Sequence, residues 1–183
     1  MTACRDNLQW VGLYSRDYDL ATPESVAHPA KASWDLAFKI LEHLEELGLL
    51  VKDSTIIDPM AGTGRIPIAA CAKGFKGIAV ELEPRFCEFL RQNKEYASRK
   101  LGREIDLQVI QGDSRKLSSL LQERGLISIT SPPYQETNDS RKFGGLKEVS
   151  PERTHHKTTD ISRFGREYDN PANIGNLPDK PFT

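Results

Sequence analysis

Apolar positions in the middle of the chain alternate between helical and strand periodicities. Between residues 36 and 47 they recur three and four positions apart, as on the buried face of an amphipathic helix that ends at Gly48. Because strands that alternate with helices form a parallel sheet covered on both faces, the whole pattern predicts a doubly wound α/β fold. The other expected helices cover residues 66–73, 117–121 and a stretch that begins at Pro84, and the expected strands cover residues 55–58, 77–81, 105–110 and 126–130.

This periodic signal divides the chain into three regions. Residues 28–134 carry nearly all of it and are expected to form a half-domain that holds the site. Residues 1–27 are mixed in composition, and we interpret them as an N-terminal arm that packs on the core. Residues 135–183 contain few apolar residues, so they predict a long, irregular and basic segment. That segment is either a contact for nucleic-acid phosphates or a solvated loop, and composition leaves both readings open.

Composition is ordinary for a cytosolic-type globular protein. The 183 residues can bury a sizeable core, and the net charge of −1 gives no global attraction to nucleic acid or membranes. The three cysteines lack a CxxC spacing, which disfavours a disulfide framework or a cysteine-based zinc site. No long apolar run or signal peptide is visible. We therefore expect a cytoplasmic protein with no metal site and no membrane partner.

Residues with binding chemistry follow three expected strands at one edge of the sheet. Asp58 precedes a turn with Gly62 and Gly64, whose backbone can approach a ligand closely. Glu81 ends the next strand about twenty residues later, where a carboxylate can accept both hydroxyls of a ribose. Asp113 follows the third strand, where it can accept from an adenine amino group. Each alone is explained as a structural turn or a surface acid, but together they predict a nucleoside-binding edge.

A short motif, Ser131-Pro132-Pro133-Tyr134, ends the fourth expected strand. It joins a hydroxyl, an aromatic ring and two prolines, which donate no backbone hydrogen bond and fix their own φ. By itself the motif is explained equally well as a plain turn and as a rigid clamp for a flat group.

In their order along the chain, DPMAGTG, VELEP, QGDS and TSPPY resemble the class I methyltransferases that use S-adenosylmethionine. More narrowly, they resemble the amino-methyltransferases that modify exocyclic amines of DNA bases, and HPAK resembles that family's motif beside the methionine end of the cofactor. The resemblance covers roughly residues 28–134 and implies a Rossmann-like fold of which about four strands are present. The family has further strands after the catalytic motif and a target-recognition region, so we expect a fragment that lacks the C-terminal half.

The resemblance implies catalysis by the TSPPY segment. The Ser131 hydroxyl and the Pro132 carbonyl would accept from the amine, so that its lone pair faces the methyl group. Pro133 would help to fix these directions, and Tyr134 would stack on a base flipped out of the duplex. The implied cofactor-binding residues are His28, Pro29, Lys31, Asp58, Pro59, Ala61, Gly62, Thr63, Gly64, Glu81 and Asp113.

The first residue of the catalytic motif bears on the acceptor. Serine is the version associated with cytosine-N4 methyltransferases, aspartate with adenine-N6 enzymes, and asparagine with several RNA or protein-amide enzymes. Ser131 therefore favours a DNA methyltransferase that acts on cytosine N4. Adenine N6, RNA, a protein amide and a non-catalytic nucleoside-binding module are the alternatives. DNA is the expected partner, a restriction endonuclease is a candidate partner, and the recognised sequence and oligomeric state stay open.

Overall fold

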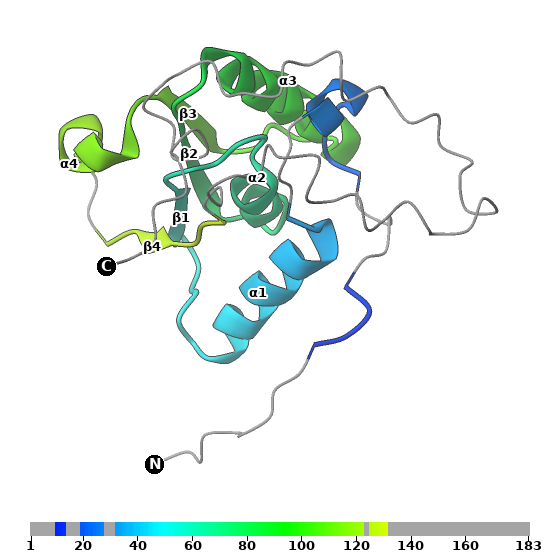
Figure 1. Ribbon diagram of the computed structural model, residues 1–183. Coiled ribbons are helices and arrows are strands. Elements are labelled where there is room, and N and C mark those ends of the chain that lie inside the picture. Colours follow the sequence, from blue (N-terminus) through cyan, green and yellow to red (C-terminus); the bar gives the residue numbers. More distant parts are fainter. Residues whose placement is uncertain (1–9, 14–18, 28–31, 123–124, 132–183) are drawn as a thin grey trace, which may run out of the picture.

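Four parallel strands form the centre of the structure, in the order β3-β2-β1-β4 (Figure 1). The computed structural model describes residues 10–13, 19–27, 32–122 and 125–131. The strands are β1 (Thr55–Asp58), β2 (Lys76–Glu81), β3 (Leu107–Gln111) and β4 (Ile127–Ser128).

The helices begin and end where the sequence provides stop signals. Pro84 occupies the first turn of α3, where a missing N–H costs nothing, and Gly102 ends that helix with a left-handed φ of 65°. The α-helices are α1 (Trp34–Glu46), α2 (Arg65–Ala72), α3 (Pro84–Leu101) and α4 (Leu117–Leu120), and the 3-10 helices are η1 (Pro23–Ala27) and η2 (Ser114–Lys116).

The two faces of the sheet are covered unequally. Ile56, Ala79 and Leu107 belong to the main core, which also contains buried side chains of α1, α2 and α3. Ile57 and Val80 belong to a smaller cluster with the apolar residues of α4. Successive residues of a strand point to opposite faces, so this division follows directly from the strand geometry. The three longer helices therefore share one face, and α4 covers the other.

The strand order reverses between β1 and β4. The chain runs outward from β1 through β2 to β3, and it then returns to the other side of β1, where Ile127 of β4 pairs with Ile56. In open α/β sheets, ligands bind outside the carboxyl ends of the strands at such a reversal. The topology thus selects the carboxyl ends of β1 and β4 as the place to look for a site.

The predicted fold class is confirmed, since the described residues form a doubly wound parallel sheet with four strands. The bounds of the expected elements shift by one or two residues in most cases. β4 is shorter than expected, and among the described residues it pairs with β1 alone. No described helix combines the length and the apolar character that a bilayer span requires.

Candidate cofactor and acceptor site

The glycine loop connects β1 to α2 at the carboxyl edge of the sheet. Gly62 and Gly64 have φ values of 55° and 82°, in the left-handed region that favours glycine. A Cβ at Gly64 would collide with the Leu90 side chain of α3, so the loop lies directly on that helix. Ala61 donates its N–H to the Val80 carbonyl at 3.0 Å. The loop is therefore held on two sides, by β2 and by α3.

Asp58 connects the two strands that flank the reversal. Its Oδ1 accepts from the Met60 N–H at 3.0 Å, and its carboxylate also accepts from the side chain of Thr130, just beyond β4. Burial raises the pKa of Asp58 to about 6, because it outweighs the stabilisation of the charge by these hydrogen bonds. This carboxylate therefore fixes the start of the glycine loop relative to the segment that leads into the SPPY motif.

Glu81 closes the glycine loop from the end of β2. Its Oε2 accepts from the Gly62 N–H at 2.8 Å, and its Oε1 accepts from the Glu83 N–H at 2.9 Å. Burial raises the pKa of Glu81 to about 7 against the effect of these backbone donors and of the Leu82 N–H. A carboxylate has about four acceptor positions, so Glu81 retains capacity for a ribose hydroxyl while it holds the loop.

Asp113 lies at the end of β3 and is paired with a neighbour. Its Oδ1 accepts from the Arg115 N–H at 3.0 Å, and Arg115 Nε lies 3.0 Å from both carboxylate oxygens. These hydrogen bonds, the side-chain ones first, lower the pKa of Asp113 to about 2. An adenine amino group at this position therefore has to share the carboxylate with Arg115.

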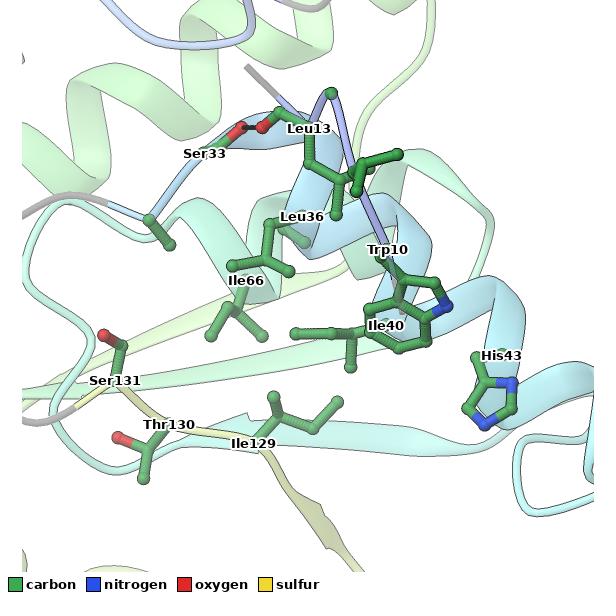
Figure 2. A pocket seen from close by; sticks show the side chains of 14 residues that line it. Trp10, Leu13, Ser33, Leu36, Ile40, His43, Ile66, Ile129, Thr130 and Ser131 are labelled. Atoms are coloured by element: carbon green, nitrogen blue, oxygen red, sulfur yellow. Dashed lines mark hydrogen bonds between the residues drawn. The ribbon is translucent and has the colours of Figure 1, made fainter. Parts of the chain in front are cut away.

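A cavity of about 840 Å³ opens beside the segment that follows β4 (Figure 2). The exposed residues Thr130 and Ser131 belong to its lining, and Ile66 at the start of α2 contributes an apolar wall. Trp10 and His43 also line the cavity and pack edge-on against each other, with ring centroids 5.4 Å apart. The remaining lining residues are Val11, Gly12, Leu13, Ala32, Ser33, Leu36, Ala37, Ile40 and Ile129.

The N-terminal arm thus contributes to the cavity as well as to the core. Leu20 and Ala21 are buried in the main core. The part from Trp10 to Leu13 lines the cavity, and the Ser33 hydroxyl at the start of α1 holds it by donating to the Leu13 carbonyl at 2.5 Å. The sequence reading missed this role. The aromatic Trp10 is the signal that could have indicated it, because aromatic rings serve both as core and as binding surfaces.

Asn93 on α3, whose side chain is fully buried, is a second residue whose role was not predicted from the sequence. It donates to the Thr63 carbonyl in the glycine loop and accepts from the Thr22 N–H. An asparagine within an otherwise apolar helix face is the signal for it, since buried amides require partners.

The structure brings the loop residues Pro59, Ala61, Gly62, Thr63 and Gly64 together at one edge with Asp58, Glu81, Asp113 and Ser131. The other predicted site residues lie outside the described residues, and their roles stay predictions. They are His28, Pro29, Lys31, Pro132, Pro133 and Tyr134. Among the described residues, no three His, Cys, Asp or Glu side chains form a group that could hold a metal ion.

The raised pKa of Glu81 predicts a pH dependence of stability. Its folded value of about 7 lies above the ordinary 4.5, so between them the folded protein binds more protons than the unfolded chain. The free energy of unfolding should therefore fall as the pH rises from about 4.5 to about 7. Glu81→Gln cannot titrate and should lose this component, which thermal unfolding of both proteins across that range would measure.

The exposed Glu88 on α3 provides the control for this measurement, because Glu88→Gln should keep the pH profile of the wild type. Asp58 adds a component of the same sign, but it is present in all three proteins and cancels in the comparison. Parallel profiles for the wild type and Glu81→Gln would contradict the assignment to Glu81.

A doubly wound sheet with a glycine loop and acidic strand ends at its reversal defines the class I methyltransferase fold. The chain belongs to the UPF0020 family, the RMKL-like methyltransferase domain, whose family model matches residues 27–123. This confirms the resemblance to methyltransferases, whereas the narrower resemblance to enzymes that act on DNA is left as a proposal. No curated protein matches the chain.

Solved structures with a similar fold include an RNA methyltransferase and a glycopeptide N-methyltransferase. TrmN from Thermus thermophilus is 19% identical with a TM-score of 0.47, over 61% of this chain and 31% of that one. An RNA methyltransferase from Salinibacter ruber in complex with S-adenosyl-L-homocysteine is 24% identical with a TM-score of 0.38, over 48% and 52% of the two chains. The glycopeptide N-methyltransferase MtfA with sinefungin is 21% identical with a TM-score of 0.39, over 51% and 35%. This chain thus spans between about a third and a half of each of them.

Proposed function

We propose that the chain binds S-adenosylmethionine and forms the cofactor-binding part of a methyltransferase that acts on an exocyclic amine of a nucleic-acid base. The observation that carries the proposal is the contact between Glu81 and the glycine loop, in which the carboxylate lies 2.8 Å from the Gly62 N–H. A carboxylate beside a backbone that a ligand can approach closely suits the binding of a ribose, and this supports the proposal. Membership of a methyltransferase domain family supports the same reading.

The residues present suit this cofactor. A Cβ at Gly64 would collide with Leu90, so the loop presents its backbone. The helix α2 begins immediately after it at Arg65, and the first N–H groups of a helix have no partner within the helix. Glu81 would hold the ribose, and Asp113 would accept from the adenine amine once it shares its oxygens with Arg115. Bound S-adenosylmethionine supplies an activated methyl group whose leaving group is a neutral thioether.

Ser131 is the described residue of the SPPY motif, and its proposed role is to act on the acceptor. Ser131 is exposed and belongs to the lining of the cavity. The segment before it is held on β1, because the Ile129 N–H donates to the Ile57 carbonyl at 3.0 Å. The lone pair of an aromatic amine is delocalised into the ring, so the amine is a poor nucleophile. A hydroxyl that accepts from the amine N–H favours the tetrahedral nitrogen that attack requires. A preorganised Ser131 hydroxyl can supply this acceptor.

Cytosine N4 in DNA is the acceptor that the serine in TSPPY favours, and adenine N6 in DNA is the next. RNA is the second polymer to consider, because a hydroxyl accepts equally well from a base amine in either nucleic acid. The cavity of about 840 Å³ beside Ser131 lies in the size range of small-molecule sites, so it has room for a flipped base.

Transfer of a labelled methyl group tests the proposed function. The full-length protein is incubated with S-adenosylmethionine that carries a radiolabelled methyl group and with duplex DNA, RNA or protein in parallel. Labelled nucleic acid is then digested to nucleosides. We expect label in DNA as N4-methylcytosine. Label in RNA alone would show that RNA, and not DNA, is the acceptor. Label in protein would contradict the proposal that the acceptor is the amine of a base. Cofactor binding without transfer to any of them would favour a non-catalytic nucleoside-binding module.

A further inference from the structure

We infer that Asn93 is a positioning residue that couples the glycine loop to the segment 19–25, so that a ligand on the loop also orders that segment. The inference rests on the proposed binding of S-adenosylmethionine and adds a residue outside the sequence motifs. It concerns a side chain that lies under the site and does not itself reach the ligand.

The amide of Asn93 bridges two segments that are far apart in the sequence. Its Nδ2 donates to the Thr63 carbonyl at 2.9 Å, and its Oδ1 accepts from the Thr22 N–H at 2.8 Å. Thr63 is 30 residues away and Thr22 is 71 residues away. A carbonyl can only accept and a backbone N–H can only donate, so these two partners fix the orientation of the amide.

On the loop side, Asn93 acts where the backbone has the most freedom. Thr63 stands between Gly62 and Gly64, both of which adopt left-handed conformations. Leu90 lies one turn earlier on α3 and blocks any side chain at Gly64. The helix therefore supports the loop by shape at Leu90 and by a hydrogen bond at Asn93, which together select one loop conformation.

On the other side, Asn93 holds a segment that leads towards a predicted ligand contact. Thr22 is further fixed because the buried Ser25 hydroxyl donates to its carbonyl at 2.7 Å. Asp19 of the same segment interacts electrostatically with Arg65, the first residue of α2. The chain continues from here to residues 28–31, whose predicted place is beside the cofactor. One buried amide thus positions both the loop and the start of this approach.

A purely structural role and a positioning role of Asn93 predict different effects of its replacement on ligand binding. If Asn93 only stabilises the fold, its loss lowers the melting temperature and leaves affinity intact wherever the protein is folded. If Asn93 couples the two segments, its loss weakens ligand binding in the folded protein. A ligand on the glycine loop then no longer orders the segment 19–25.

The variant Asn93→Leu keeps the side-chain volume and removes both hydrogen bonds. Gln92→Leu is the matched control, because Gln92 is the adjacent amide on α3 and its contact is with Glu88 on the helix surface. Affinity for S-adenosylhomocysteine is measured by calorimetry at a temperature where circular dichroism shows both variants folded. We expect Asn93→Leu to lose on the order of tenfold in affinity, and Gln92→Leu to stay within about twofold of the wild type.

Amide hydrogen exchange gives the second readout. In the wild type, S-adenosylhomocysteine should slow exchange over residues 61–65 and also over residues 20–25. In Asn93→Leu, the protection of residues 20–25 should disappear.

Three results would overturn the coupling role. One is wild-type affinity in folded Asn93→Leu, and another is equal loss in Gln92→Leu. The third is wild-type protection confined to residues 61–65, which decides the question even if Asn93→Leu does not fold. A wild-type protein that does not bind S-adenosylhomocysteine at all would instead contradict the proposed function, and the coupling with it.

Discussion

Replacing Ser131 with alanine should reduce methyl transfer on the order of 100-fold or more while leaving cofactor affinity nearly unchanged. The hydroxyl belongs to the lining of the cavity and can accept a hydrogen bond from an amine there. Removal of one preorganised hydrogen-bonding group from a reaction centre typically costs two to three orders of magnitude in turnover. Single-turnover transfer of a labelled methyl group, with cofactor affinity measured by calorimetry on the same protein, separates the two effects.

Ser128 offers a matched control for this experiment. It is an exposed serine on β4, three positions before Ser131, and it does not line the cavity. Ser128→Ala should therefore transfer methyl groups at the wild-type rate. If Ser131→Ala also kept that rate, the hydroxyl would have no part in activating the amine, and the SPPY motif would be a turn.

Replacing Glu81 with alanine should weaken cofactor binding on the order of 100-fold. Two losses combine in this variant, because the proposed acceptor for the ribose is removed and the Gly62 and Glu83 N–H groups lose their carboxylate. A buried donor without a partner costs about 1–3 kcal/mol, and a tenfold change in affinity corresponds to about 1.4 kcal/mol. Calorimetry with S-adenosylhomocysteine measures the affinity directly.

Glu88→Ala is the control here, because its side chain is 58% exposed on α3 and contacts only its own helix among the described residues. It should bind the ligand as the wild type does. Folded Glu81→Ala with nearly unchanged affinity would show that the carboxylate serves only to close the loop. Wild-type binding itself would then have to depend on other contacts.

The pairing of Asp58 with Thr130 gives the two halves of the proposed site a common support. Asp58 starts the glycine loop, and Thr130 immediately precedes Ser131, so one hydrogen bond joins the cofactor side to the acceptor side across the strand reversal. Methyl transfer requires the methyl group and the attacking nitrogen to be held close together and aligned, and small displacements reduce the rate strongly.

The succession of helices and strands, and the edge on which the acidic residues gather, could both be predicted from the amino-acid sequence. Both follow from local signals. Apolar periodicity marks which face of each element is buried, Pro84 and Gly102 mark where α3 begins and ends, and parallel strands place their carboxyl ends on one edge. The glycine loop was readable for the same reason, because its conformation depends on glycines that are adjacent in the chain.

The contacts between these residues could be known only once the packing of the chain was described. Periodicity shows that a face is buried but not what it is buried against, so the sequence could not show that β4 returns beside β1 and brings Thr130 to Asp58. It also could not show that Trp10 shares a cavity with Ser131. Nor could it show that Asn93 hydrogen-bonds to Thr63, which is 30 residues away in the sequence, and to Thr22, which is 71 residues away. These contacts arise from the packing of distant segments, and that packing is what assembles the proposed site from its separate motifs.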